Sequence, residues 1–146
     1  THEGKVAAEN IAGYNSVFDP ITIPSVIYTN PEIAWAGYTE SDLRNKKIKY
    51  NKGIFPWSAS GRAMTNGQAI GKTKILTSED NSKILGVGIS GNNAGELISE
   101  AMLAIEMGAN VEDISLTIHP HPTLSETFAN ASEVLTKTIT DLYIKS

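Results

Sequence analysis

Two of the three histidines in this 146-residue chain stand in one short segment, Ile118-His119-Pro120-His121-Pro122-Thr123-Leu124-Ser125-Glu126. The alternating prolines force an extended backbone, which makes it hard for His119 and His121 to converge on one metal ion. No H-E-x-x-H motif or evident third ligand accompanies them, so the sequence predicts no metal site. The chemistry open to this segment is that of an imidazole and a carboxylate.

Glu126 has two interpretations. Thr123 and Glu126 have the spacing of a capping box, in which each side chain satisfies a backbone N–H of the other at the start of a helix. Alternatively, a carboxylate in a first helical turn can reach back to His121 and fix its tautomer. Such a pair is a candidate general base, with an effect of ~10²–10⁴-fold in rate. Spacing alone favours the cap.

Two helices are predicted to position this segment, over residues 95–107 and 124–136. Apolar residues at helical spacing predict the core face of the second, namely Leu124, Phe128, Ala131 and Leu135. In the first, Leu97, Ala101, Ala104 and Ile105 share one face, and Leu103 falls within the polar arc of Glu96, Ser99, Glu100 and Glu106. Leu103 is therefore either a lone exposed leucine or a residue covered by a partner subunit.

The rest of the chain favours short strands, over residues 25–28, 33–37, 48–55, 71–77 and 83–90. The last two are joined by a hairpin turn at residues 78–82. A short helix is predicted after the N-cap Thr39, a loop over 56–67, and an extended segment up to Pro122. Residues 3–12 are typical of the tail of a helix ended by Gly13, and 14–24 of a linker. Strands followed by helices predict an α+β domain on an antiparallel sheet.

One glycine-rich stretch, Gly86-Val87-Gly88-Ile89-Ser90-Gly91, fits the G-x-G-x-x-G pattern of dinucleotide-binding loops, with Glu106 ~20 positions further on. That pattern requires its glycines in the turn after a strand of a βαβ unit. Here the apolar residues alternate with Gly86 and Gly88, which places these glycines inside a strand. They are predicted to make room for a neighbouring helix or backbone. Nucleotide binding within this chain is therefore rejected.

Composition excludes several classes of protein. The net charge is −4, with 40% hydrophobic residues and no cysteine, which fits one globular domain without disulfides or thiolate chemistry. The run Lys46–Lys52 alternates like a half-buried edge strand with a solvated face, and we expect no nucleic-acid binding. We also expect no membrane span and no signal peptide. The lack of cysteine fits a reducing compartment, and we expect a cytoplasmic protein.

The block His119–Glu126 resembles the H-x-H-P-T-L-x-E signature of the dihydrolipoyl dehydrogenases, which are flavin-dependent pyridine-nucleotide disulfide oxidoreductases. Residues 28–37 are similar to the Y-T-x-P-E-x-A-x-x-G motif at the start of the interface domain of that family. Further matches are Ser60-Gly61-Arg62-Ala63 and Gly91-Asn92-Asn93-Ala94-Gly95-Glu96-Leu97. Pro120 stands where alanine is also usual, which leaves the His121–Glu126 spacing intact.

The resemblance implies a C-terminal interface (dimerisation) domain. Residues 1–13 would be the tail of a helix from an upstream FAD domain, 14–24 a linker, and 25–146 the interface domain. The protein would be a homodimer in which His121, oriented by Glu126, acts as acid and base on a lipoyl thiol in the partner's active site. The backbone of His121 and Pro122 would contact the partner's FAD, and His119 would have no catalytic role.

By the same resemblance, FAD and NAD act in the full-length enzyme, none is bound by this chain alone, and the isolated chain is inert. The acyltransferase subunit of 2-oxo acid dehydrogenase complexes would be a further partner. The alternative is a non-catalytic dimerisation or complex-docking module, in which His121 and Glu126 serve structure only.

Overall fold

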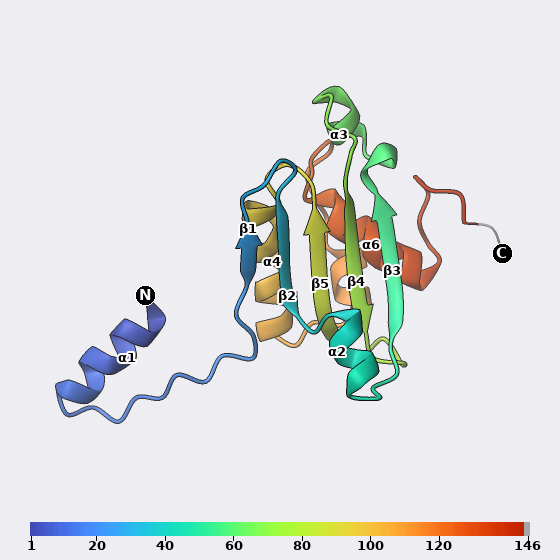
Figure 1. The fold of residues 1–146 in the computed structure, drawn as a ribbon. Helices are drawn as coiled ribbons and strands as arrows, with labels where there is room; N and C mark the ends of the chain where they lie inside the picture. Colours follow the sequence, from blue (N-terminus) through green and yellow to red (C-terminus); the bar gives the residue numbers. More distant parts are fainter. Residues whose placement is uncertain (145–146) are drawn as a thin grey trace.

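The strands form one five-stranded antiparallel sheet with its two longest helices on one face, as Figure 1 shows. The computed structural model describes residues 1–144. In chain order the strands are β1 (Ser25–Ile27), β2 (Ile33–Gly37), β3 (Asn51–Pro56), β4 (Lys72–Thr77) and β5 (Ile84–Ser90), and their order across the sheet is β1-β2-β5-β4-β3. The predicted α+β class is confirmed, because all four strand pairs of the described residues, β1–β2, β2–β5, β3–β4 and β4–β5, are antiparallel and helices pack on the sheet.

The helices that cover the sheet are α4 (Ala94–Glu106), over β1, β2 and β5, and α6 (Glu126–Thr136), over β3 and β4, while α5 (Val111–Leu116) packs on α6. The core lies between this helical layer and the sheet, and its largest enclosed side chains include Phe55, Trp57 and Ile75. The predicted apolar stripe of the last helix is confirmed: Leu124, Phe128 and Ala131 are buried, and Leu135 packs against the core.

The N-terminal helix α1 (His2–Ile11) buries none of its residues and lies away from the sheet in Figure 1. Residues 14–24, the predicted linker, form neither helix nor strand. The proposed division into residues 1–13, 14–24 and 25–146 stays a prediction, and its last two residues, Lys145 and Ser146, lie outside the described residues. None of the helices in residues 1–144 is long and apolar enough to cross a membrane.

The basic run of residues 46–52 enters an edge strand, as predicted, only at its last two residues, and for the rest of the run the prediction was wrong. A short helix, α2 (Glu40–Asn45), precedes it, with Thr39 as its N-cap as expected. Lys47 has a φ of +55°, and the N–H of Ile48 donates to the carbonyl of Leu43 (2.9 Å). This positive φ and this hydrogen bond are those of a Schellman motif that ends α2. Residues 46–48 therefore belong to the end of a helix, and β3 begins only at Asn51.

Three short helical elements were also missed. The predicted loop at 56–67 contains the 3₁₀ turn η1 (Trp57–Ala59) and helix α3 (Gly61–Thr65), and the predicted extended segment contains α5. Each α-helix carries a capping signal that was overlooked, because Ser60 accepts from the N–H of Ala63 and Asn110 forms a capping box with Asp113.

Gly86 and Gly88 lie inside β5, between β2 and β4, while Gly91 follows the end of the strand. The context on which the dinucleotide interpretation was rejected is therefore confirmed. At Gly86 a Cβ atom would collide with the Tyr38 carbonyl oxygen, so this glycine does make room for a neighbouring backbone. At Gly88 a Cβ would meet nothing within 4 Å, and the same explanation is wrong there.

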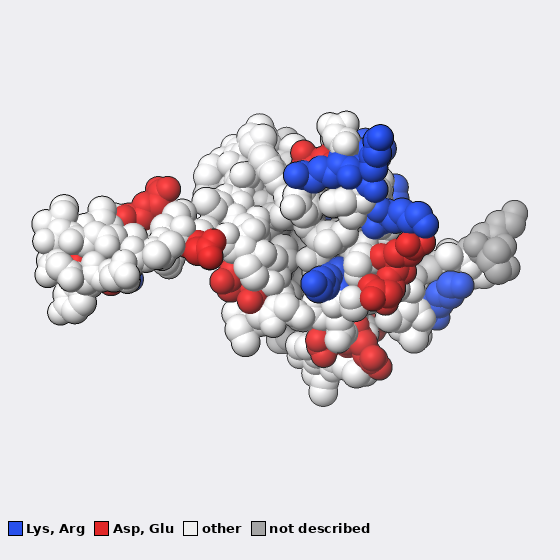
Figure 2. All heavy atoms as spheres, turned by 90° about the horizontal axis from the view of Figure 1, so that it is seen from below, with Lys and Arg blue, Asp and Glu red and all other residues white. Residues whose placement is uncertain are grey.

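A charged cluster holds α2 against the open side of the sheet. The Glu40 carboxylate accepts hydrogen bonds from Lys74 (2.7 Å), Lys52 (3.2 Å) and Tyr50 (3.0 Å). The Lys74 hydrogen bond is the largest cause that lowers the pKa of Glu40 to about 2. Figure 2, which looks at the underside of the view in Figure 1, shows basic and acidic side chains side by side on this surface.

The start of α4 is capped from a distance. Its N-cap residue Asn93 has a φ of +61° and makes no side-chain cap bond, whereas Glu32 Oε2 accepts a hydrogen bond from the N–H of Gly95 (2.9 Å). A carboxylate at this position also interacts favourably with the helix dipole. Glu32, part of the 28–37 motif, therefore joins the beginning of β2 to the helix that covers it.

Candidate acid–base site

The segment 117–125 connects α5 to α6 and carries the predicted site on the surface of the domain. His121 is 79% exposed along its side chain, whereas Glu126, in the first turn of α6, is 23% exposed. Their side chains meet, with 2.8 Å between His121 Nδ1 and Glu126 Oε1. The two residues predicted to form an acid–base pair are thus brought together within one chain.

The chemistry of the partners assigns the proton on His121. An ionised carboxylate only accepts hydrogen bonds, so Nδ1 carries the hydrogen and the neutral ring keeps its lone pair on Nε2. With the side chain largely exposed, Nε2 is free to take a proton from a group brought to this surface. Such a geometry suits a general base oriented by a carboxylate.

The predicted capping box is only half formed. Glu126 Oε2 accepts from the N–H of Thr123 (2.6 Å), as expected for its half. The Thr123 hydroxyl instead donates to the Pro120 carbonyl (2.7 Å), and the helix begins at Glu126 with Ser125 as its N-cap residue. The prediction that Thr123 begins the helix was therefore wrong by about half a turn, because its hydroxyl bonds backwards along the chain.

A buried chain of hydrogen bonds fixes this turn to the sheet. Trp57 Nε1 donates to Thr73 Oγ1 (3.0 Å), which lies 2.8 Å from Thr127 Oγ1, and Thr127 donates to the Leu124 carbonyl (2.7 Å). Because each hydroxyl has one hydrogen, the direction of every bond follows from the indole N–H at one end and the carbonyl at the other. Thr127 directly follows Glu126, so the chain holds the carboxylate in place.

His119 lies apart from His121, as the proline spacing predicted. Its ring contacts Glu100 on α4, with 2.7 Å between Nε2 and Oε1, and its side chain is 7% exposed. Within residues 1–144 no cluster of three potential ligands could hold a metal ion. Glu100 was not singled out from the sequence, where 19 residues separate it from His119 and no local pattern joins them.

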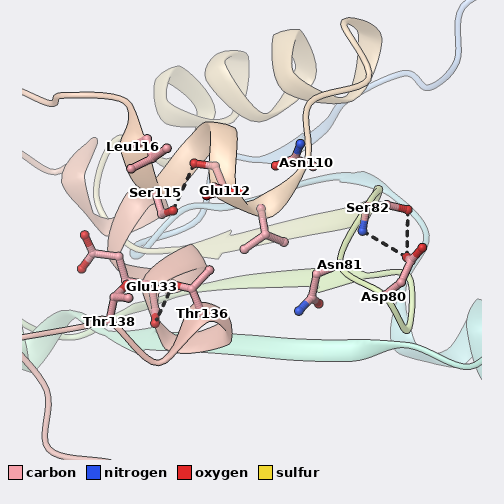
Figure 3. Close-up of a pocket in the computed structure, with 11 residues that line it drawn as sticks. Asp80, Asn81, Ser82, Asn110, Glu112, Ser115, Leu116, Glu133, Thr136 and Thr138 are labelled. Atoms are coloured by element: carbon pink, nitrogen blue, oxygen red, sulfur yellow. Dashed lines mark hydrogen bonds between the residues drawn. The ribbon is translucent and has the colours of Figure 1, made fainter.

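A hollow of about 610 Å³ lies elsewhere on the surface, between the β4–β5 turn and helices α5 and α6 (Figure 3). Its lining includes the carboxylates of Asp80, Glu112 and Glu133, and contains neither His121 nor Glu126. Burial, and then the negative charge of Asp141, raise the pKa of Glu133. The candidate acid–base site is thus an exposed surface and not a closed pocket of this chain.

Comparison with known proteins identifies the family of the domain that carries this site. Residues 23–132 match the family model described as the dimerisation domain of pyridine nucleotide-disulphide oxidoreductases. The chain belongs to this family. The suspected resemblance is confirmed, and so is the expectation that the fold is that of the interface domain of these reductases.

Relatives of this dimerisation domain are much longer than the chain. A dihydrolipoyl dehydrogenase of Buchnera aphidicola from Acyrthosiphon pisum is 54% identical over 97% of the chain, and one of Haemophilus influenzae is 51% identical over 97%. In both cases the chain spans 30% of the relative's length.

Solved structures agree on the fold. LpdA from Mycobacterium tuberculosis superimposes with a TM-score of 0.82 at 23% identity, covering 92% of the chain and 29% of LpdA. The HOCl-induced flavoprotein disulfide reductase RclA from Escherichia coli gives a TM-score of 0.84 at 18% identity, with 92% and 31% covered.

Proposed function

We propose that this chain is the interface domain of a dihydrolipoyl dehydrogenase, and that it supplies the His121–Glu126 pair to the active site of a partner subunit in a homodimer. The observation that carries the proposal is the orientation of His121: Nδ1 is bound to Glu126, while Nε2 is exposed. The names and identities of the long relatives support the activity.

The proton step follows from this orientation. His121 Nε2 takes the proton of a dihydrolipoyl thiol, and the thiolate that remains attacks a disulfide far faster than the thiol would. The Glu126 carboxylate stabilises the imidazolium that forms, because its negative charge lies 2.8 Å from the ring. The dithiol substrate loses two electrons and two protons and becomes the cyclic disulfide.

The disulfide that accepts these electrons lies outside this chain, which has no cysteine. FAD and NAD, held by other parts of the enzyme, supply the redox chemistry that follows. The residues of this chain fit a role beside such a group, because His121 and Pro122 are both exposed at the surface. In the proposal, α1 and its exposed linker belong with the FAD domain, which would give α1 the packing that it lacks here.

The homodimer is supported by apolar side chains near the site. Leu103 on α4 and Met107, the residue that caps its end, are 63% and 75% exposed, and Ile118, next to His119, is 96% exposed. Apolar surface of this kind marks a contact with another protein. We therefore prefer the interpretation that a partner subunit covers Leu103 to the interpretation that it is a lone exposed leucine. Docking of the acyltransferase subunit of a 2-oxo acid dehydrogenase complex at the dimer remains compatible with this arrangement.

Substitution of His121 tests the proposal in the full-length enzyme. His121→Gln is expected to lower dihydrolipoamide oxidation by ~10²–10⁴-fold while the dimer persists in analytical ultracentrifugation. Glu112→Gln, which changes an exposed carboxylate of α5, is the control and should keep full activity. Near-normal turnover by an intact His121→Gln dimer would overturn the catalytic role and leave the non-catalytic docking module as the function.

A further inference from the structure

His119 differs from its neighbour in that both of its ring nitrogens have partners. Nδ1 lies 2.8 Å from the Thr117 carbonyl oxygen, and Nε2 lies 2.7 Å from Glu100 Oε1. The side chain is only 7% exposed, against 79% for His121. The proposed function uses neither His119 nor Glu100.

Both partners of His119 are acceptors. A backbone carbonyl never donates, and an ionised carboxylate has no hydrogen to give, so each contact requires a hydrogen on the facing ring nitrogen. A neutral imidazole has one N–H and would turn a lone pair toward one of these oxygens. The geometry therefore points to the doubly protonated imidazolium. The 2.7 Å distance to Glu100 is also in the range of charge-assisted hydrogen bonds.

The charged groups around His119 agree with a cation there. Glu100 faces it from α4, and within residues 1–144 Glu100 forms no ion pair with lysine or arginine. From α6, Glu133 is close enough that the positive charge of His119 acts to lower its pKa, against the larger effect of burial. Glu100 thus contacts His119 directly, and Glu133 is the second carboxylate whose charge interacts with it.

The position of His119 connects this ion pair to the acid–base site. Only Pro120 separates it from His121, and the proline ring fixes φ, which limits how far the two histidines can move independently. On the far side, the Pro120 carbonyl accepts the hydrogen bond of Thr123 (2.7 Å). The backbone before His121 is therefore held twice, to α4 through His119 and to the turn before α6 through Thr123.

We propose that imidazolium His119 and Glu100 form a clamp that positions His121 for its reaction. His119 acts as a positioning residue, because it reaches the reacting atoms only through the backbone of Pro120 and His121. The clamp also joins the site to α4, the helix that exposes Leu103 and Met107, so a partner packed on α4 would set the place of His121. The proposal takes its reaction from the proposed function, but the protonation state of His119 does not depend on it.

The test uses the full-length protein with isotope-labelled histidine, and NMR of the ring nitrogens at pH 7. Signals are assigned by their loss in His119→Gln and His121→Gln. The expected result is two N–H groups on His119 and a single N–H, at Nδ1, on His121. Glu100→Gln, which keeps the size of the side chain but removes its charge, should abolish the doubly protonated signature of His119 and disturb the His121 signals.

Activity gives the second readout. Glu100→Gln and His119→Gln are expected to lower kcat for dihydrolipoamide by ~10- to 100-fold with little change in KM, since a displaced base costs rate and not binding. Glu96→Gln, an exposed carboxylate one turn earlier on α4, is the control and should stay within about twofold of wild type.

A singly protonated His119 in the wild type, or His121 signals unmoved by Glu100→Gln, would overturn the clamp. Unchanged kcat in both variants would overturn it as well. If the wild-type protein does not oxidise dihydrolipoamide, the proposed function fails, and the NMR comparison alone then decides whether the clamp exists.

Discussion

Replacing Glu126 by glutamine tests the assignment of the proton on His121. The carboxylate accepts two hydrogen bonds, one from His121 Nδ1 (2.8 Å) and one from the N–H of Thr123 (2.6 Å). Glutamine has the same length but only one acceptor oxygen, while its other terminal atom donates. One of the two donors must therefore lose its partner in Glu126→Gln.

The exposure of the two donors decides which bond is lost. The backbone N–H of Thr123 is half-buried and can only donate a hydrogen bond, never accept one. Leaving it without an acceptor costs about 1–3 kcal/mol. The exposed ring of His121 can instead move its proton to Nε2 and accept from the glutamine amide. A preference of that size leaves the free Nε2 lone pair in ~10% to ~1% of molecules. The base is then absent in most of them.

The expected outcome for Glu126→Gln is a ~10- to 100-fold lower rate of dihydrolipoamide oxidation with an intact dimer and a loss of stability of about 1 kcal/mol or less. Glu126→Ala removes both acceptor bonds and should lower activity and melting temperature together. Steady-state turnover and urea denaturation of the full-length enzyme measure the two effects. Glu112→Gln, an exposed first-turn carboxylate of α5, is the control. A Glu126→Gln enzyme with full activity, or with the His121 proton still on Nδ1, would refute the reasoning.

Three further substitutions test the scaffold. The hydrogen bond from the Lys74 ammonium is the main cause that lowers the folded-state pKa of Glu40 from 4.5 to about 2. The ionised Glu40 therefore contributes its full share to the free energy of unfolding above about pH 5, and this share is lost as the pH falls toward 2. Glu40→Gln should therefore cost about 2 kcal/mol in urea denaturation at pH 7 and much less at pH 2.5, whereas Glu79→Gln, from an exposed ion pair, should cost less than about 0.5 kcal/mol at either pH. An equal loss from Glu40→Gln at both pH values would exclude the ionic explanation. Glu32→Ala should lower stability by about 1 kcal/mol through the lost cap of α4, and an unchanged denaturation midpoint would contradict that role. Thr127→Val interrupts the buried hydroxyl chain and should cost about 1–3 kcal/mol, while a neutral result would show that the chain carries no net stability.

The strands and covering helices could be predicted because their signals are local. Alternating apolar residues define β5, the turn at 78–82 joins it to β4, and the four-residue spacing of Leu124 and Phe128 marks the buried face of the last helix. The errors came where one polar atom decides a boundary. Lys47 adopts a conformation usually left to glycine, and the Thr123 hydroxyl bonds to the chain before it instead of the helix after it. Neither choice is visible in residue type alone.

The candidate site divides in the same way. His121 and Glu126 are five residues apart, and their pairing follows from a turn that the sequence itself marks. The His119–Glu100 contact spans 19 residues and depends on the tertiary fold, which brings the connection before α6 next to α4. Sequence reasoning therefore anticipated the contact between His121 and Glu126, whereas it gave His119 no part in the site.

The two histidines of this segment show how neighbours with the same side chain acquire different chemistry. His121 meets one acceptor, keeps one lone pair and stays exposed, so it can exchange a proton with a substrate. His119 meets two acceptors and is enclosed, so both of its nitrogens are used in holding the backbone. A base that must take and return a proton needs a ring that is oriented at one nitrogen and free at the other. Pro120 keeps the two rings apart, and their separation allows one to remain reactive while the other, fully bonded, fixes where it stands.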